Sequence, residues 1–338
     1  MDKTQRETIT RRQAVGMVGV GMAAAAGGSA YAQGTAPANP RHQGEPAMDD
    51  PRTKYPKPPF KDQTQPWPGL ASKMDPKPDH GETSYKGSGR LAGRKALITG
   101  GDSGMGRAAA IAYAREGADV AINYFPTEEP DARAVIQLIK DAGRNGVAIP
   151  GDLREEAFCQ RLVAEAVQKL GGLDVVVCNA GRQQSRPSIL DLTTEDFDAT
   201  MKTNIYAPFW IIKAALPHLS AGSCIIGTTS EQAYDPSPDL YDYAQTKAAT
   251  MNYVKSLAKQ LGGRGIRVNG VAPGPIWTPL QISGGAQPQK YKSFGSTTAL
   301  GRPGQPAELA SIYVQLAASD ASFATGNIYG SGGGQGQP

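Results

Sequence analysis

The chain has 338 residues, a length that accommodates two domains or one large domain with additional segments. Its formal charge of +4, from 35 basic and 31 acidic residues, is too small to indicate a nucleic-acid-binding or membrane-binding surface. The 3 cysteines and 3 histidines show neither CxxC nor HxxxH spacing, which argues against a metal site and against a disulfide framework. We expect Cys159, Cys178 and Cys224 to be buried free thiols.

The first 32 residues have the layout of an export signal. A charged start ends in Arg11-Arg12, an apolar run follows from residue 14 to 26, and Ala30-Tyr31-Ala32 forms a small-x-small cleavage site. The apolar run is shorter than the roughly 20 residues of a stable membrane anchor. The adjacent arginines resemble a twin-arginine signal, which implies export to the periplasm in folded form. The alternative is a flexible start of a cytoplasmic protein with a chance arginine pair.

Residues 33–92 are rich in proline, with 11 prolines between Pro37 and Pro78 and no apolar period. This composition predicts an extended arm without a core of its own. The arm is either a linker or a segment that lies over its own domain or a neighbouring subunit. Its aromatic side chains could anchor it there: Tyr55, Phe60, Trp67 and Tyr85.

Apolar runs and helical patterns alternate from residue 94 onward. The runs that predict strands are residues 95–99, 118–123, 146–150, 174–178, 223–227, 266–271 and 326–329. Helical patterns lie between them at residues 108–116, 131–142, 155–170, 194–219, 242–261 and 307–318. Such alternation is typical of right-handed crossovers and a parallel sheet covered on both faces. The sequence predicts one α/β domain, residues 93–338, with a doubly wound, Rossmann-like sheet of seven parallel strands.

The turn between the first strand and the first helix is rich in glycine. Residues 99–106 read TGGDSGMG. Residues without a β-carbon permit a tight bend and let backbone N–H groups approach a pyrophosphate at the helix N-terminus. Because this is the first βα turn of an alternating domain, it has the context that a dinucleotide-binding motif requires.

The TGxxxGxG spacing resembles that of the short-chain dehydrogenase/reductase family, and motifs along residues 91–330 agree with it. Asp152-Leu153 follows the third strand, and Asn179-Ala180-Gly181 matches the family's NAG motif, with Cys178 where the family more often has Asn. Tyr243 and Lys247 form YxxxK, Ser230 lies 13 residues earlier, and Pro273-Gly274 and Thr278 follow the sixth strand. Residues 85–106 and 272–280 look most similar to the bacterial general-stress branch, which carries a Pro-rich N-terminal extension.

The resemblance implies four catalytic residues: Asn204, Ser230, Tyr243 and Lys247. Tyr243 would give a proton to a carbonyl oxygen or take one from an alcohol, and Lys247, on the same helix face, would lower the pKa of Tyr243 and hold the nicotinamide ribose. Ser230 would bind the substrate oxygen, and Asn204 would hold a relay water. The implied cofactor-binding residues are Gly100, Asp102, Ser103, Gly104, Met105, Gly106, Asn123, Tyr124, Asp152, Leu153, Asn179, Ala180, Gly181, Tyr243, Lys247, Pro273, Gly274, Ile276 and Thr278.

The choice between NAD and NADP depends on the end of the second strand, which reads Asn123-Tyr124-Phe125-Pro126. An acidic residue there favours NAD and an arginine favours NADP, and neither is present. Asp102 and Ser103 in the glycine turn offer no positive charge to a 2′-phosphate. Both cofactors stay open, and the sequence favours NAD.

The substrate is expected to meet residues 182–192, 233–240 and 277–300. Trp277, Leu280, Ile282, Tyr291 and Phe294 predict a fairly apolar pocket for a small aldehyde, ketone or alcohol. The predicted function is hydride transfer between NAD or NADP and such a substrate. The alternative is a nucleotide-binding redox sensor or scaffold without turnover, since an exported enzyme would meet little free nicotinamide.

Two helical segments carry more apolar residues than one sheet face can cover. They are residues 194–219 and the helix that contains Tyr243. Family members commonly pair through these helices. We therefore expect a homo-oligomer, either a dimer or a tetramer, to which the Pro-rich arm could contribute.

Overall fold

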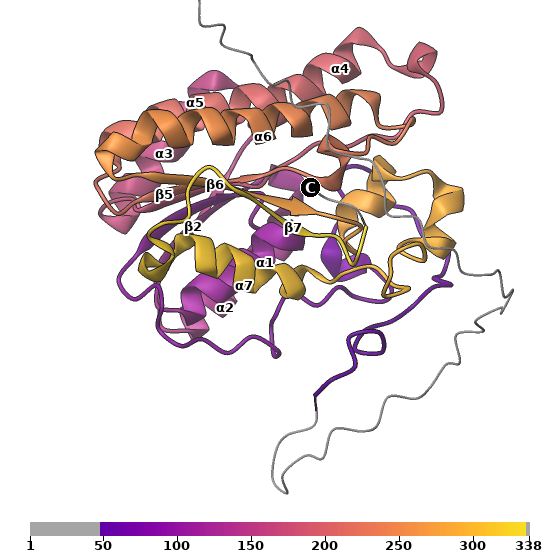
Figure 1. The fold of residues 1–338 in the computed structure, drawn as a ribbon, viewed down its shortest axis with the longest axis horizontal. Helices are drawn as coiled ribbons and strands as arrows, with labels where there is room; N and C mark the ends of the chain where they lie inside the picture. The colour runs from indigo at the N-terminus through magenta and orange to yellow at the C-terminus, as the bar shows by residue number, and fades with distance from the viewer. Residues whose placement is uncertain (1–47, 336–338) are drawn as a thin grey trace, which may run out of the picture. The chain divides into compact units, whose positions relative to one another are not determined.

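The computed structural model describes residues 48–335 and contains the seven parallel strands that the sequence predicts (Figure 1). They are β1 (Lys95–Thr99), β2 (Asp119–Tyr124), β3 (Gly146–Pro150), β4 (Val175–Cys178), β5 (Cys224–Thr228), β6 (Arg267–Pro273) and β7 (Ile328–Ser331). Their order in the sheet is β3-β2-β1-β4-β5-β6-β7, and every pairing is parallel. The predicted doubly wound, Rossmann-like fold is confirmed.

Helices cover both faces of the sheet (Figure 1). One layer contains α1 (Gly104–Arg115), α2 (Glu129–Asp141) and α7 (Pro306–Ala317). The other contains α3 (Glu156–Leu170), α4 (Thr194–Met201), α5 (Ala207–Ala215) and α6 (Tyr241–Leu261). The strands between these layers are almost continuously apolar, as parallel strands buried on both faces must be. Cys159, Cys178 and Cys224 are buried free thiols, as predicted.

The strand order reverses beside β1, which lies between β2 and β4. The chain adds β2 and β3 on one side of β1 and then crosses back to add β4 on the other side. In doubly wound sheets, ligands bind in the crevice that this reversal opens at the carboxyl ends of the strands. The turn that follows β1 lies directly at this crevice.

The predicted long helix over residues 194–219 contains a wider turn in its middle. It consists of α4, a π-helical turn over Lys202–Tyr206, α5 and a 3₁₀ turn over Leu216–His218. Asn204 lies in the π-helical turn and is buried. Single π-helical turns inside helices are frequent at functional sites.

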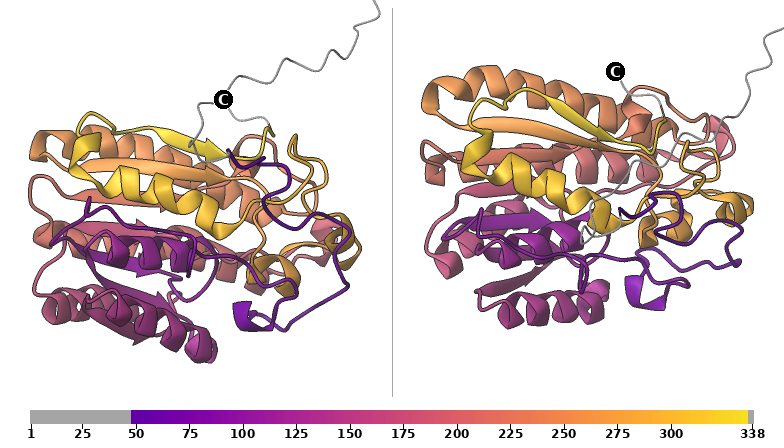
Figure 2. Two further views of the ribbon diagram at one scale, coloured as in Figure 1. Left: turned by 90° about the horizontal axis from the view of Figure 1, so that it is seen from below. Right: turned by 60° about the horizontal axis from the view of Figure 1, so that its bottom comes forward.

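The described part of the Pro-rich arm, residues 48–92, lies on its own α/β domain (Figure 2). It is extended or turned, apart from a 3₁₀ turn over Ala71–Lys73. Phe60 stacks on Trp277 with ring centres 4.4 Å apart, and the Tyr85 hydroxyl donates to Glu116 at 2.6 Å. These contacts agree with one of the alternatives expected from the sequence, in which the arm lies on its own domain.

The predicted export signal, residues 1–32, and residues 33–47 of the arm lie outside the described residues. Among residues 48–335, no helix has the length and apolar character needed to cross a membrane.

Candidate active site

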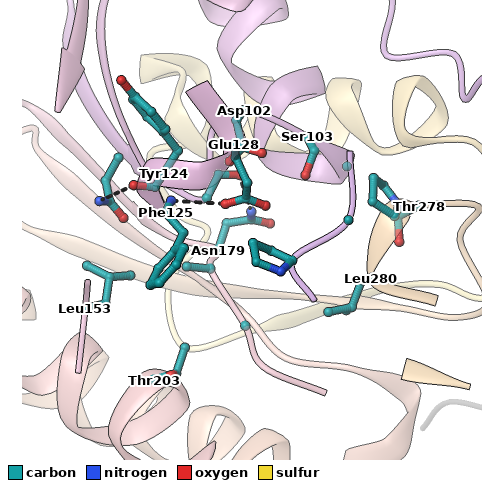
Figure 3. A pocket seen from close by; sticks show the side chains of 18 of the residues that line it. Asp102, Ser103, Tyr124, Phe125, Glu128, Leu153, Asn179, Thr203, Thr278 and Leu280 are labelled. Carbon is teal, nitrogen blue, oxygen red and sulfur yellow. Dashed lines mark hydrogen bonds between the residues drawn. The ribbon is translucent and has the colours of Figure 1, made fainter. Parts of the chain in front are cut away.

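Two adjoining cavities lie at the carboxyl ends of the strands, and Met105, Asn179 and Thr278 line both of them. The first cavity, shown in Figure 3, lies over the crevice beside β1. The second has a volume of about 350 Å³ and contains Tyr243 and Lys247 in its wall. This size is within the range of small-molecule sites.

The first cavity gathers most of the predicted cofactor-binding residues. Those that line it are Gly100, Asp102, Ser103, Gly104, Met105, Asn123, Tyr124, Asp152, Leu153, Asn179, Ala180, Gly181 and Thr278. Pro273, Gly274, Ile276, Tyr243 and Lys247 line the second cavity instead. Gly106 lines neither and supports the turn from behind. The two cavities together therefore bring nearly the whole predicted set to one groove.

The glycine turn has the backbone geometry of an anion cradle. Gly100 and Gly104 have φ angles of +61° and +52°, which residues with a β-carbon rarely adopt. A β-carbon at Gly106 would lie 2.0 Å from the carbonyl oxygen of Gly100, so only glycine fits there. Ser103 precedes α1 in an extended conformation without a side-chain cap, and no acidic residue occupies the first turn. The N–H groups of α1 are therefore free to bind a pyrophosphate, and the chain's residues fit a dinucleotide.

Thr99 and Asn179 fix the position of this turn. The Asn179 side-chain amide donates to the carbonyl oxygens of Thr99 at 3.2 Å and Gly100 at 3.1 Å. The Thr99 hydroxyl oxygen accepts the backbone N–H groups of Asn179 at 3.0 Å and Ala180 at 3.1 Å. These bonds tie the end of β1 to the end of β4, so that the NAG motif forms the floor of the groove.

The two residues expected to recognise the adenine ribose direct their polar atoms elsewhere. The side-chain amide of Asn123 donates to the backbone of β3 and the residue after it, to Ile149 at 3.2 Å and Gly151 at 3.3 Å. The Tyr124 hydroxyl donates to Glu129. Asn123 and Tyr124 line the cavity, but their polar side-chain atoms are bonded within the protein. Recognition of the ribose would therefore depend on other side chains.

A carboxyl pair that the sequence analysis missed lies at this end of the cavity. Glu128, on a short 3₁₀ turn after β2, lies beside Asp102 of the glycine turn (Figure 3). Asp102 is buried, and its Oδ2 has no hydrogen-bond partner among the described residues. Burial and the neighbouring Asp102 raise the pKa of Glu128, so the pair shares a proton at neutral pH. The available signal was an acidic residue a few positions after the second strand.

Ser230, Tyr243 and Lys247 meet in the second cavity. The Ser230 hydroxyl lies in the same wall as the Tyr243 phenol and acts to lower the pKa of that phenol, and it accepts the backbone N–H of Gln232 at 3.2 Å. Lys247 follows Tyr243 by one turn of α6, and its Nζ donates to the carbonyl oxygen of Thr228 at 2.9 Å. The predicted proton donor, substrate-binding hydroxyl and ammonium therefore lie in one wall.

Burial shifts the pKa values of both titratable groups in this wall. It raises the pKa of Tyr243 to about 12, against the hydrogen bond from Ser230, and lowers the pKa of Lys247 to about 8. The expected lowering of the Tyr243 pKa by the ammonium is therefore wrong. The ammonium is 5.3 Å from the ring centre and bonds to a backbone oxygen, so desolvation of the phenolate outweighs its attraction.

Asn204 lies behind this wall and lines neither cavity. Its side-chain amide donates to the carbonyl oxygen of Arg182 at 2.9 Å and to the Thr246 hydroxyl at 3.0 Å. Its Oδ1 accepts the backbone N–H of Arg182 at 2.8 Å. Asn204 thus joins the segment after β4 to the turn of α6 between Tyr243 and Lys247.

The predicted apolar substrate pocket is wrong for three of its five residues. Trp277, Ile282 and Tyr291 are buried in a core cluster with Phe60 and Met74 of the arm. Only Leu280 and Phe294 of the predicted five line the second cavity. Its wall is mixed: apolar side chains such as Leu240, Ile276 and Phe294 alternate with the polar side chains of Gln183, Glu231, Gln232, Asp239, Gln281, Lys290 and Gln335. The arm covers Trp277, Ile282 and Tyr291, which leaves a cavity less apolar than the sequence predicts.

Glu231 is a further residue that the sequence analysis missed. It follows Ser230 directly and lines the second cavity. Its Oε2 is buried and has no hydrogen-bond partner among the described residues. Burial raises the pKa of Glu231 to about 7. Such a carboxyl group is suited to bind a hydroxyl group of a ligand.

Comparison with known proteins decides the family. A family model described as enoyl-(acyl carrier protein) reductase matches residues 100–335. A short chain dehydrogenase of Burkholderia cenocepacia, solved in complex with NADP, is 34% identical over 72% of this chain and 98% of that chain, with a TM-score of 0.68. The chain belongs to the short-chain dehydrogenase/reductase family. The recognition of the family from the sequence is confirmed.

Curated relatives within this family match almost over their full length. An uncharacterized oxidoreductase of Escherichia coli, YghA, is 55% identical over 85% of this chain and 98% of its own length. General stress protein 39 of Bacillus subtilis is 46% identical over 79% of this chain and 93% of its own length. A glucose and ribitol dehydrogenase of Daucus carota is 40% identical over 82% of this chain and 96% of its own length.

A second solved member binds the other nicotinamide cofactor. The short chain dehydrogenase of Mycobacterium paratuberculosis, bound to NAD, is 28% identical over 73% of this chain and 98% of that chain, with a TM-score of 0.66. This short-chain dehydrogenase/reductase is therefore an NAD(P)-dependent enzyme, and of the two functions that the sequence left open the comparisons favour catalysis.

Proposed function

We propose that this enzyme interconverts a carbonyl compound and its alcohol, with Tyr243 as the general acid and base. The two hydroxyl groups of Ser230 and Tyr243 carry this proposal, because both line a cavity that adjoins the dinucleotide groove. A hydroxyl pair at such a position can hold a carbonyl oxygen and give it a proton. The second cavity, with a volume of about 350 Å³, has room for a small substrate.

In the reducing direction the C=O double bond of the substrate becomes a C–OH single bond. Tyr243 gives its phenol proton to the carbonyl oxygen, and the Ser230 hydroxyl donates a hydrogen bond to the same oxygen. When bound in the adjoining groove, a reduced nicotinamide would supply the hydride that the carbonyl carbon gains. Because burial keeps the phenol protonated at neutral pH, Tyr243 holds the proton that this direction consumes.

We further propose that the substrate carries several hydroxyl groups. The second cavity presents carboxyl, amide and ammonium groups in its wall, among them Glu231, Gln183 and Lys290. A ligand that leaves buried polar groups unpaired binds poorly, so a purely apolar substrate is disfavoured. A relative at 40% identity is named a glucose and ribitol dehydrogenase, which supports a sugar or polyol substrate.

We propose NAD as the preferred cofactor. The first cavity is lined by the carboxyl groups of Asp102, Glu128 and Asp152 and by no lysine or arginine of the described residues. A 2′-phosphate next to the Asp102–Glu128 pair would meet negative charge without a cation to balance it. The 2′-hydroxyl of NAD would instead find an acceptor in the buried Asp102 carboxyl.

We propose that the chain is exported to the periplasm through its twin-arginine-type N-terminus. The support is the arginine pair, the short apolar run and the Ala30-Tyr31-Ala32 cleavage site. Fractionation of expressing cells tests this, with replacement of Arg11 and Arg12 by Lys as the matched control. Retention of both forms in the cytoplasm would contradict export.

We propose that the chain forms a homo-oligomer by pairing through α5 and α6. We also propose that it belongs with the general-stress relatives, one of which is 46% identical to it. Large aromatic side chains at these helices are exposed: Tyr206, directly before α5, by 50%, Phe209 of α5 by 57% and Tyr241 of α6 by 50%. Covering them on a second subunit would stabilise an isologous dimer. Light scattering on Phe209→Lys should show a smaller particle than the unchanged chain.

The proposed activity is tested by titrating the protein with NADH and NADPH and then screening carbonyl compounds. Nicotinamide fluorescence should show saturable binding of NADH at lower concentration than NADPH. Consumption of NADH should then depend on an added aldose or ketose. Saturable binding without turnover on any carbonyl compound or polyol would contradict the catalytic part of the proposal.

A further inference from the structure

The N-terminal arm contributes residues to the dinucleotide cavity. Trp67, Pro68 and Gly69 line it, although they precede the α/β domain by more than 20 residues. Solved members of the family match only 72–73% of this chain while being covered over 95–100% of their own length. The matched part has about the length of the α/β domain, so this wall is an addition that the arm makes to the common fold.

Trp67 contacts two segments that follow strands of the sheet. Its ring centre lies 5.4 Å from that of Phe125, which follows β2. The guanidinium carbon of Arg182, which follows β4, lies 6.0 Å from the Trp67 ring centre. A β-carbon at Gly69 would lie 3.2 Å from the side chain of Ser283, in the loop after β6. The arm therefore contacts the segments after β2, β4 and β6, of which Phe125 and Ser283 line the cavity.

The turn that presents Trp67 is closed by one side chain. The Gln65 amide group donates to the carbonyl oxygen of Leu70 at 3.0 Å, and its Oε1 accepts the backbone N–H of Leu70 at 2.7 Å. These two bonds join the ends of residues 65–70 in the manner of a small Ω-loop. The loop is thus shaped by its own contacts and does not need a ligand to hold its form.

Both ends of this loop are also fixed to the domain. The backbone N–H of Gln65 donates to the carbonyl oxygen of Ile282 at 3.0 Å. The buried carboxylate of Asp131, on α2, accepts the backbone N–H of Ala71 at 2.6 Å. A segment held on both sides keeps its indole in place, which lowers the entropic cost of using it in binding.

Two aromatic side chains and one aliphatic side chain line this end of the cavity: Trp67, Phe125 and Leu153. The two aromatic rings are tilted by 53° to each other, so they form a corner against which a flat ring can stack. Figure 3 shows Phe125 and Leu153 at the same end of the cavity, away from Thr278. Stacking of a nucleobase on an aromatic side chain stabilises binding substantially.

We propose that the loop of residues 65–70 is the outer wall of the dinucleotide site, and that Trp67 covers the adenine base and slows its release. The inference rests on the proposed function only in that a nicotinamide dinucleotide is the ligand. It assigns a binding role to a segment outside the family's common domain.

The test uses the full chain and its Trp67→Ala variant, with Phe323→Ala as a control. Phe323 is a fully exposed aromatic residue that lines neither cavity. Stopped-flow nicotinamide fluorescence measures the dissociation rate and Kd of NADH. Trp67→Ala should raise both by about 10-fold or more, as loss of base stacking does, while Phe323→Ala leaves both unchanged. Trp67→Phe should recover most of the affinity.

Fragments of the dinucleotide locate the contact. ADP-ribose should bind Trp67→Ala more weakly by a similar factor, whereas nicotinamide mononucleotide should bind both proteins equally. The melting temperature without nucleotide should change by about 2 °C or less, which shows that the fold is kept. If Trp67→Ala is unstable, Trp67→Leu replaces it in the same comparison.

Two results overturn the inference in different ways. Equal dissociation rates and Kd values for the unchanged chain and Trp67→Ala would remove Trp67 from the site and leave the proposed function intact. Failure of the unchanged chain to bind either NADH or NADPH would contradict the proposed function and this inference with it.

Discussion

The ammonium nitrogen of Lys247 lies 5.3 Å from the centre of the Tyr243 ring, and its hydrogen bond goes to the backbone carbonyl oxygen of Thr228 at 2.9 Å. The two side chains are one helical turn apart on α6, which brings them to the same cavity. Both are buried, and burial disfavours the charged form of each. The protonated phenol is therefore the main form of Tyr243 at neutral pH.

The first prediction concerns the pH dependence of the two reaction directions. Alcohol oxidation needs the phenolate of Tyr243, whose pKa is raised to about 12, so its kcat should increase with pH from 6 to 9. Carbonyl reduction needs the phenol, which stays protonated over this range, and should show no loss from Tyr243 ionisation. Steady-state rates in both directions measure this. An oxidation rate that is flat with pH would contradict the assignment of Tyr243 as the base.

A second prediction concerns the stability cost of Lys247. Its pKa is lowered to about 8 in the folded protein, so the unfolded chain binds more protons between about pH 8 and 10.5. The contribution of Lys247 to the free energy of unfolding should therefore increase with pH across that window and be lowest below about pH 8. Lys247→Met should therefore raise the melting temperature at pH 7 by several degrees while abolishing turnover. A lower melting temperature for Lys247→Met would contradict a buried ammonium at this position.

A third prediction concerns cofactor choice. The double variant Asp102→Asn, Glu128→Gln removes the negative charge of the carboxyl pair. It should improve binding of NADPH relative to NADH by about 10-fold, because an uncompensated charge contact of this kind contributes on the order of 1–2 kcal/mol. Fluorescence titration with both nucleotides measures the ratio. Asp141→Asn, which changes an exposed carboxylate at the end of α2 outside the cavity lining, serves as the matched control.

A fourth prediction concerns substrate recognition by Glu231. If its buried carboxyl group binds a substrate hydroxyl, Glu231→Gln should raise KM for a sugar or polyol by about 10-fold, the usual effect of one charged hydrogen bond. The Kd of NADH should not change. An aldehyde without hydroxyl groups provides the control, since its KM should be the same for both proteins. An equal KM for the polyol would remove Glu231 from substrate binding.

The sheet and the glycine turn were predictable because local patterns specify them. The apolar runs of β1, β2 and β4 alternate with helical patterns, and the glycines after β1 have the spacing of a dinucleotide-binding turn. The YxxxK spacing places Tyr243 and Lys247 on one face of a helix without knowledge of the tertiary fold. Such features depend on neighbours within a few residues of each other.

The parts that the sequence analysis missed depend on contacts between distant residues. Trp277, Ile282 and Tyr291 look like pocket residues until Phe60 and Met74 are known to cover them. Glu128 gains its importance only when β2 brings it beside Asp102. The pKa of Tyr243 follows from the depth of its burial, which a four-residue spacing does not reveal.

The proposed reaction depends most directly on Tyr243. The measurement is the rate of NADH oxidation at saturating NADH with a sugar or other carbonyl substrate, for the unchanged chain and for Tyr243→Phe. Removing the proton donor should lower the rate by about 100-fold to 10,000-fold without changing the Kd of NADH. Equal rates for the two proteins would contradict the assignment of Tyr243 as general acid and base, and with it the proposed reaction.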